Sequence, residues 1–328
     1  LMAEEGLRAL ATALPAIETA ITGRTTSRAA RSAALQVAVA RLSAENFGTD
    51  QVGRYEALMT LGAELNQAEN FAAAADAYRD ALVLQDRVLG PRHPDRVGAV
   101  LHLALNLSNL GRTAEAAPLF AEAAQLAPAA TDPVAPARLL HYQGLDATNR
   151  GEPAQAARLL SEAEARYTWL LPSSLFAAAP LRLADAAAPA MGLDATQQSA
   201  LLGLVEVQRN RAVALARAGQ AEESRRIAAR SRALAQRAGL DDGIVLGRNL
   251  RSEGMARELL AMAGAQPLYA AAADRFASAQ AEERPEAVSL FLSGARLSAE
   301  GRRVEALDAF RRGAGILRAR QLGVPVTL

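Results

Sequence analysis

The sequence predicts an all-α fold, built as a right-handed solenoid of about seven antiparallel helix pairs. Roughly a quarter of the 328 residues are alanine, the strongest intrinsic helix former, and only 4% are aromatic. Apolar residues recur at the i, i+3, i+4, i+7 spacing of an amphipathic helix, and the period of two that a half-buried strand requires is missing. The same helix-pair pattern returns along most of the chain, which indicates a repeat protein.

The first expected helix pair occupies residues 3–46, with a break near residues 23–26. Its second helix places small and aliphatic side chains on one stripe, at Ala30, Ala34, Val37 and Leu42. A second pair is expected at residues 55–89. The segment that follows it, residues 89–96, contains two prolines and a glycine, and these residues predict a turn.

The clearest helix pair lies at residues 97–128, with a break at residues 109–111. It matches the pair at residues 55–89 when the numbering is moved by 42 residues. The coincident positions are Leu58, Leu61, Gly62, Leu65, Ala74, Tyr78 and Ala81 in one pair, and Val100, Leu103, Ala104, Leu107, Ala116, Phe120 and Ala123 in the other. Seven coincidences over two helices identify an internal repeat.

Weaker copies of the pattern follow at residues 136–170, 206–238 and 286–320. A glycine recurs before the second helix of the better copies, at Gly111, Gly151, Gly219 and Gly301. Gly151 and Gly219 lie 68 residues apart, twice 34, which predicts a degenerate pair within residues 172–199. Another degenerate pair is expected within residues 243–280.

The segment at residues 172–194 is the least regular, because three prolines follow one another closely. We expect a long connector or distorted helices there. The chain is therefore divided into an N-terminal sub-array (residues 1–171, clearest at 54–128), an irregular proline-rich connector (172–194) and a degenerate C-terminal sub-array (195–328). Asp194 and Gln197 have the spacing of a capping box and predict the start of the next helix.

The repeated pattern resembles the tetratricopeptide repeat (TPR). The resemblance is carried by a Leu-Gly or Leu-Ala pair between large residues on the first helix, an Ala-x-x-x-aromatic-x-x-Ala pattern on the second, and a closing Pro128. The 42-residue spacing and the Leu-Gly-Pro-x-His-Pro-Asp linker are similar to the kinesin-light-chain-like subclass. The likeness is specific in residues 54–128 and looser elsewhere. It implies that small residues such as Gly62 and Ala104 let neighbouring helices cross closely.

In TPR-like proteins the ligand surface is the concave groove formed by the first helices. The resemblance implies that the groove residues of this chain are Met59, Asn66, Leu101, Leu105, Asn109, Arg138, His141, Leu145, Asn149, Arg209 and Arg217. An asparagine amide can hold a peptide backbone from both sides, and the leucines suit an extended or helical segment. The alternative is that these leucines and asparagines pack against a neighbouring helix.

Composition excludes several kinds of chemistry. The chain contains no cysteine and no lysine, which removes disulfides, thiolate metal sites, a P-loop lysine and Schiff-base chemistry. A formal charge of +1 argues against a dedicated nucleic-acid-binding protein. No uncharged run reaches the ~18–20 residues of a membrane span, and Glu4, Glu5 and Arg8 interrupt any signal peptide. We expect a cytoplasmic protein, or a periplasmic one after removal of an export signal.

The three histidines do not form a metal-binding or catalytic motif. His93 lies in a turn and is expected to serve there, whereas His102 and His141 lie on first helices with exposed or groove-facing imidazoles. The chain also lacks a G-x-S-x-G elbow and a glycine-rich phosphate loop. We therefore expect no enzymatic activity, no cofactor and no metal in this segment.

The stretch at residues 205–240 carries eight arginines against three acids. It is either a site for a partner that bears carboxylates or phosphates, or a solvated face of a lysine-free protein. Arg211 is the most informative of these arginines because the repeat expects leucine at its position. Its side chain either extends into solvent or pairs with a carboxylate such as Glu206.

These observations favour a non-enzymatic scaffold that binds a protein or peptide partner, or the chain's own further part, in the concave groove. The alternative is the regulatory or sensor arm of a larger protein. Bacterial chains with repeats of this length resemble the arm that precedes a caspase-like (CHAT) peptidase domain, and the uncharged residues 323–328 suit such a continuation. A sensor for a small ligand or signalling peptide is a third hypothesis. The oligomeric state stays open.

Overall fold

The computed structural model describes residues 51–176, 192–240, 243–279 and 284–322 of the chain. These residues form twelve α-helices and three short 3-10 turns, with no strand among them, which confirms the all-α prediction. The helices are α3 (Gln51–Gln67), α4 (Phe71–Leu89), α5 (Val97–Asn109), α6 (Thr113–Leu126), α7 (Ala135–Asn149), α8 (Pro153–Trp169), α9 (Ala195–Arg217), α10 (Ala221–Arg237), α11 (Gly243–Leu259), α12 (Ala265–Ser278), α13 (Arg284–Ala299) and α14 (Arg303–Leu322).

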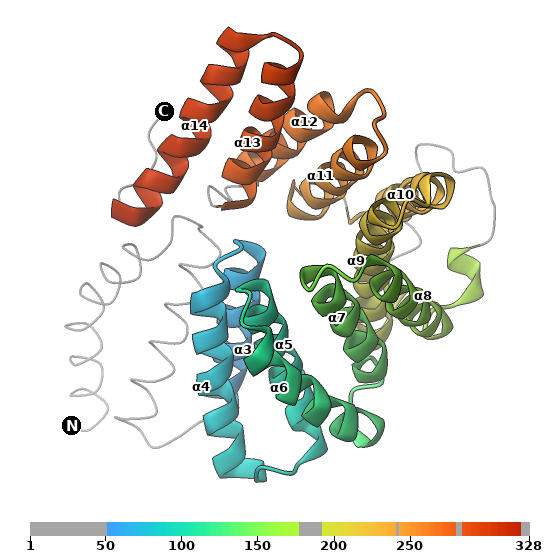
Figure 1. Cartoon of the computed structure of the whole chain (residues 1–328). Coiled ribbons are helices and arrows are strands. Elements are labelled where there is room, and N and C mark those ends of the chain that lie inside the picture. The colour runs from blue at the N-terminus through green and yellow to red at the C-terminus, as the bar shows by residue number, and fades with distance from the viewer. Residues whose placement is uncertain (1–50, 177–191, 241–242, 280–283, 323–328) are drawn as a thin grey trace.

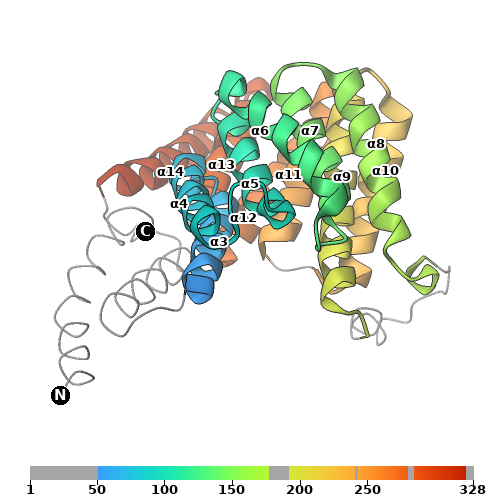
Figure 2. The same cartoon turned by 90° about the horizontal axis from the view of Figure 1, so that it is seen from below.

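The helices pack as consecutive pairs, and each helix also contacts the first helix of the next pair. The chain curves so that the first helices (α3, α5, α7, α9, α11, α13) lie around a common centre and the second helices lie outside them (Figures 1 and 2). We call the side that carries the first helices the inner face. The predicted solenoid is confirmed for the six pairs described. The pair expected at residues 3–46 and the segment 323–328 lie outside the described residues.

Glycines form the turns inside four of the six pairs, as the sequence predicts. Gly111, Gly151, Gly219 and Gly301 have φ between 76° and 80°, a left-handed conformation that costs other residues energy. Each turn closes with the same backbone bond, such as the one from Arg112 N to Leu107 O at 2.9 Å. In the two remaining pairs, Glu69 and Ala261 take this left-handed position.

Close contact between a small residue on the first helix and a large residue 16 positions later holds the two helices of a pair together. A Cβ atom added to Gly62 would lie 2.6 Å from the Tyr78 ring, and one added to Gly144 would lie 2.6 Å from Leu160. Gly294 and Phe310 repeat this arrangement in the last pair. These glycines remove the Cβ that would hold the helix axes apart, so the large side chain fills the crossing point.

The proline-rich connector does not interrupt the hydrophobic core. One core cluster runs from Val134, just before α7, to Ala238, just after α10, and α8 packs directly on α9. Asp194 and Gln197 form the predicted capping box at the start of α9, with Gln197 N donating to Asp194 Oδ1 at 2.8 Å. Residues 177–191, which include most of the expected degenerate pair, lie outside the described residues.

Two glycine-to-alanine substitutions test the crossing contact in opposite directions. We expect Gly62→Ala to destabilise the protein by about 1–3 kcal/mol, because the new methyl group overlaps the buried Tyr78 ring. The control Gly98→Ala lies on α5 with no atom within 4 Å of the added Cβ, and it should stabilise by about 0.5–1 kcal/mol through helix propensity. Urea unfolding midpoints measure both changes. Equal midpoints for Gly62→Ala and the native chain would contradict the packing described here.

Candidate functional site

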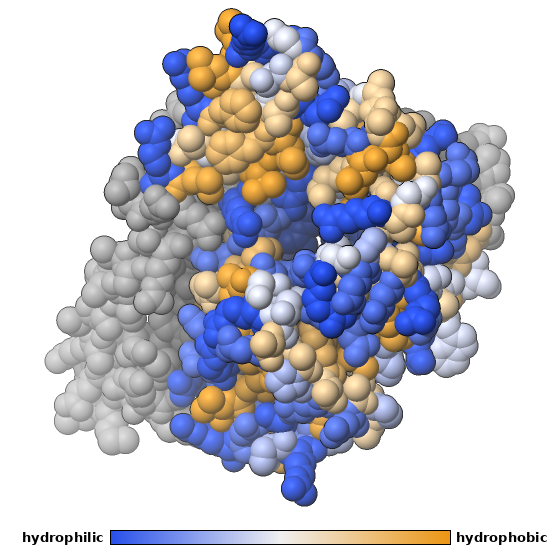
Figure 3. Space-filling view, in the orientation of Figure 1, coloured by the Kyte–Doolittle hydropathy of each residue, from blue (hydrophilic) through white to orange (hydrophobic). Residues whose placement is uncertain are grey.

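The inner face is hollowed near its centre and hydrophilic there. Figure 3 shows the hollow between α3, α5 and α7 on one side and the C-terminal helices on the other. Polar side chains of neighbouring first helices meet on this face. Asn66 Nδ2 on α3 donates to Asn106 Oδ1 on α5 at 3.0 Å. Ser108 on α5 donates to Asp146 Oδ1 on α7 at 2.7 Å, so each helix is tied to the next.

Two histidines lie within an aromatic cluster on the same helices. The His102 ring stacks on Tyr78 at a centroid distance of 4.8 Å, and its Nδ1 lies 3.3 Å from the Tyr142 hydroxyl. His141 Nε2 lies 3.0 Å from the Asn210 amide nitrogen. Burial lowers the pKa of His102 to about 3 and that of His141 to about 4, with a further contribution from the positive charge of Arg138 in both cases. Both imidazoles are therefore neutral at physiological pH.

Arginines from α7, α9 and α11 also lie on the inner face. Arg138 on α7 donates to Asp132 Oδ2 at 2.8 Å. Arg248 on α11 donates to Glu206 Oε1 at 3.4 Å and to the Gln67 carbonyl at 3.2 Å. Arg209 on α9 interacts electrostatically with the charges of Glu206 and Arg248. Burial lowers the pKa of Arg209 to about 10; the charge of Glu206 opposes this shift, and the charges of Arg248 and Arg251 add to it.

The curve brings residues about 180 to 210 positions apart into contact. Arg251 on α11 forms an ion pair with Glu69 in the α3–α4 turn, and Arg284 lies 5.6 Å above the Phe71 ring. The Glu69 and Arg251 side chains are only 12% and 14% exposed. Burial raises the pKa of Glu69, but the nearby Arg251, Arg248 and Arg284 charges lower it by more, so its net pKa is below the ordinary value. These contacts, which we call the closing contacts, join the two sides of the hollow.

The chain matches no protein-family model and no curated protein sequence. A solved structure of a Rap protein complexed with a competence and sporulation factor is similar to it, with 14% sequence identity and a TM-score of 0.63 over 89% of this chain and 72% of that chain. The fold is TPR-like. At this identity the similarity establishes the fold and nothing further.

Two structures of a putative kinesin light chain from Podosopora anserina, with nearly identical TPR-like repeats, match with 16% identity each. They cover 82% and 83% of this chain and 97% and 99% of their own, with TM-scores of 0.35. Values this low add nothing to the fold assignment, which rests on the Rap structure.

Within the TPR-like fold, the predicted groove residues fall into three groups. Asn66, Arg138 and Arg209 make the inner-face contacts described above. His141 is only 2% exposed, so the prediction of an exposed or groove-facing imidazole is wrong for this residue. Met59 and Leu145 are half-buried on first helices, while Arg217 is exposed in the last turn of α9. Asn109 and Asn149 bind each other, with Asn149 Nδ2 donating to Asn109 Oδ1 at 3.0 Å. Partner binding by any of them stays a prediction.

The prediction that Leu101 and Leu105 line an open groove is wrong. Their side chains are 0% and 5% exposed, and Leu101 belongs to the core shared by α3 to α7. The physical reason is that α5 is enclosed by its neighbours, which leaves Gly98, His102 and Asn109 as its partly exposed inner residues. The alternative interpretation, that the leucines pack against adjacent helices, is the correct one for this TPR-like array.

Arg211 pairs with carboxylates, but Glu206 is not among them. Its Nη1 donates to Glu164 Oε2 on α8 at 2.6 Å, and its Nη2 lies 3.5 Å from Glu223 Oε1 on α10. Gln208 also donates to Glu164, at 2.9 Å. Arg211 therefore replaces the apolar contact of the repeat by an ion pair that joins three helices of the TPR-like array.

Sequence reasoning missed the polar partners that complete the inner face. Glu206 and Arg248 lie 42 residues apart, and Asn66 and Asn106 lie 40 apart, close to one repeat length. Complementary polar residues at that separation would have identified these contacts. No such signal exists for Glu69 and Arg251, because their separation of 182 residues spans several repeats.

His93 serves the turn that precedes α5, as predicted. Its Nδ1 accepts a hydrogen bond from Asp95 N at 3.3 Å. Among the residues that the structure describes, no group of three histidine, aspartate or glutamate side chains is placed to hold a metal ion. In the same residues, no helix combines the length and apolar character needed to cross a bilayer.

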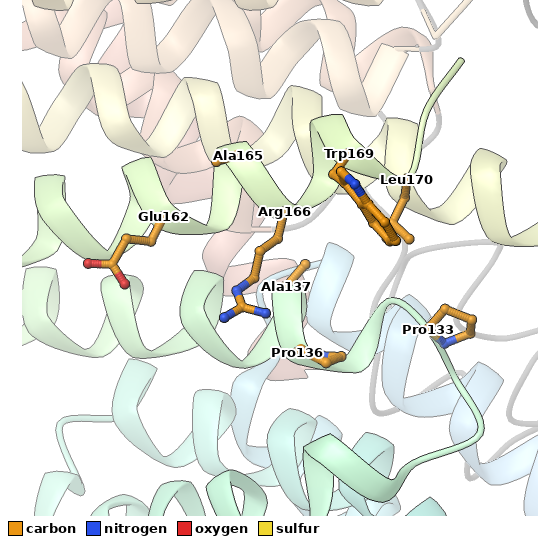
Figure 4. Close-up of a pocket in the computed structure, with 8 residues that line it drawn as sticks. All are labelled: Pro133, Pro136, Ala137, Glu162, Ala165, Arg166, Trp169 and Leu170. Carbon is orange, nitrogen blue, oxygen red and sulfur yellow. The ribbon is translucent and has the colours of Figure 1, made fainter. Parts of the chain in front are cut away.

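A separate cavity of about 570 Å³ lies on the outer face, between the start of α7 and the end of α8. Trp169, the chain's single tryptophan, borders it with 84% of its surface exposed. Figure 4 shows Trp169 and Leu170 at one end of the cavity, and Arg166 reaching from α8 toward Pro136. Both apolar and charged side chains line this cavity, and none of them takes part in the closing contacts.

The substitution Glu69→Gln tests the closing contacts. Removing the charge of Glu69 leaves the buried Arg251 without its counter-ion. We expect the free energy of unfolding, measured with urea at pH 7, to fall by about 3 kcal/mol. Because folding lowers the pKa of Glu69, this loss should shrink as the pH falls below the unfolded value of 4.5. Glu115→Gln, which breaks an exposed pair with Arg112, serves as the control and should change little. An equally small effect of Glu69→Gln would contradict closure.

Acid sensitivity provides a test of the buried imidazole of His141. Its pKa in the folded protein, about 4, is below the unfolded value of 6.5, so the unfolded chain binds the proton first. Lowering the pH from 7 to 5 should therefore cost about 2 kcal/mol through this one group. In His141→Gln the difference between the unfolding free energies at the two pH values should shrink by that amount. An unchanged pH dependence would show that the imidazole titrates normally.

Proposed function

We propose that the chain is a protein-interaction scaffold that binds a segment of a partner protein in the hollow of its inner face. The observation that carries this proposal is the gathering of polar side chains from first helices of several successive pairs around one hollow (Figure 3). An extended segment can contact such a surface over several repeats, and side-chain amides and guanidinium groups can bind its backbone and its polar groups.

The structural similarity supports a partner of this kind. The Rap protein whose fold this chain shares was solved in complex with a competence and sporulation factor, so one protein of this architecture binds a further molecule. The partner of the present chain is proposed from the inner-face residues, since 14% identity does not transfer a ligand. The regulatory-arm hypothesis rests on the repeat spacing and on the uncharged residues 323–328, and it stays a prediction.

Site-specific photocrosslinking tests the proposal. Because the chain has no cysteine, a single introduced cysteine can carry a benzophenone group at one known place. Leu145→Cys puts the label on the half-buried inner side of α7, and Ala114→Cys puts it on an exposed position of α6. In extracts of the source organism, we expect the Leu145→Cys label to form one main adduct that mass spectrometry identifies as a protein.

Two controls make this result interpretable. Excess unlabelled native chain should compete the adduct away, and the Ala114→Cys label should not yield it. The same adducts from both positions, or none from the inner one, would argue against binding on the inner face.

A further inference from the structure

Arg209 lies in the hollow without a described carboxylate as an ion-pair partner. Arg209 projects from α9 among Glu206, Arg248, Arg251 and Glu69, the four groups whose charges act on it. Its hydrogen-bond partner is Ser252, whose Oγ lies 3.5 Å from Nη1, the outer limit of a hydrogen bond. Among the described residues no carboxylate lies within ion-pair distance of Arg209.

The two neighbouring carboxylates are already occupied. Glu206 accepts from Arg248, which also donates to the Gln67 carbonyl. Glu69 accepts from Arg251 in the closing contacts. Arg248 and Arg251 therefore occupy these two carboxylates, and the half-buried Arg209 beside them has no carboxylate of its own among the described residues. Removing a guanidinium group from water without a counter-ion is costly, so an anion that reaches this place gains stabilisation.

The other candidate arginines either form ion pairs with carboxylates or are exposed to solvent. Arg211 is held by Glu164 and Glu223, and Arg138 by Asp132. Arg217 is exposed at the end of α9, where solvent screens its charge. The arginine-rich stretch that the sequence presents as one candidate site is thus divided by the fold, and Arg209 is the member that lies in the hollow beside the closing contacts.

We propose that the hollow recognises an acidic segment of the partner protein, and that Arg209 receives the carboxylate of one glutamate or aspartate side chain. This inference rests on the proposed function and names the chemistry of its ligand. The planar fork of arginine matches a carboxylate with two parallel hydrogen bonds. One carboxylate charge balances the one positive charge of Arg209. A phosphate dianion would bring a second negative charge close to Glu206 and Glu69.

Matched peptides test this proposal on the whole chain. The probes are fluorescein-labelled Ala-Glu-Ala-Glu-Ala with an amidated C-terminus and the same peptide with glutamine in place of glutamate. Fluorescence anisotropy at low salt should show binding of the glutamate peptide at least about tenfold tighter than of the glutamine peptide. Arg209→Gln should abolish this difference, and Arg209→Lys should retain part of it because the charge remains. The control Arg217→Gln should leave the difference unchanged.

The results separate this inference from the proposed function. Equal binding of both peptides, a preference for glutamate that survives in Arg209→Gln, or no binding of either peptide would overturn the role of Arg209. The crosslinking from Leu145→Cys would still stand if the partner binds by uncharged contacts. Loss of that crosslink together with retained glutamate selectivity would instead overturn the scaffold function and leave an anion site. Unfolding midpoints of the variants confirm that each is folded under the assay conditions.

Discussion

The contact between a small residue on a first helix and a large residue on the following second helix is the constraint on which the rest of the structure depends. Gly62 under Tyr78 and Gly144 under Leu160 let two helix axes approach until the large side chain fills the crossing point. Once pairs of this shape form, each can bury its remaining apolar face only against the next pair, so the array grows in one direction. A left-handed turn residue joins the two helices of each described pair, and it is glycine in four of the six. The curve, and with it an inner and an outer face, follows from repeating this unit.

The inner face then has to satisfy polar groups that the curve removes from water. Asn106 and Ser108 are buried, and each bonds to a side chain of the adjacent first helix. Arg251 and Glu69 extend this principle across the hollow, where the two sides of the curve meet. Polar contacts of this kind add little net stability, because desolvation offsets their attraction, but they fix which surfaces face each other. Arg209 differs from these paired groups, because no carboxylate of the described residues lies within ion-pair distance of it.

The two faces of the array consequently differ in the chemistry that they offer a partner. The inner face presents amides and guanidinium groups from successive repeats, which suits a segment that runs along several helices. The outer cavity beside Trp169 presents one large exposed aromatic ring and prolines at a single place. Recognition that depends on charge is therefore expected on the inner face. In addition, Arg209 lies near the closing contacts, since the charges of Glu69 and Arg251 both act on it.

The sequence by itself determined what depends on neighbouring positions and on one repeat length. The helix pairs, the left-handed glycines, the capping box of Asp194 with Gln197 and the small-to-large contact of Gly62 with Tyr78 all follow from local spacing, because their partners lie within one helix pair. Tertiary structure alone decided which inner positions stay accessible. Leu105 is buried although its offset in the repeat resembles that of the half-buried Leu145, and Arg211 pairs with Glu164 rather than with Glu206. The pairing of Glu69 with Arg251 also required the folded curve, since small rotations between successive pairs add up before residues about 180 positions apart can meet.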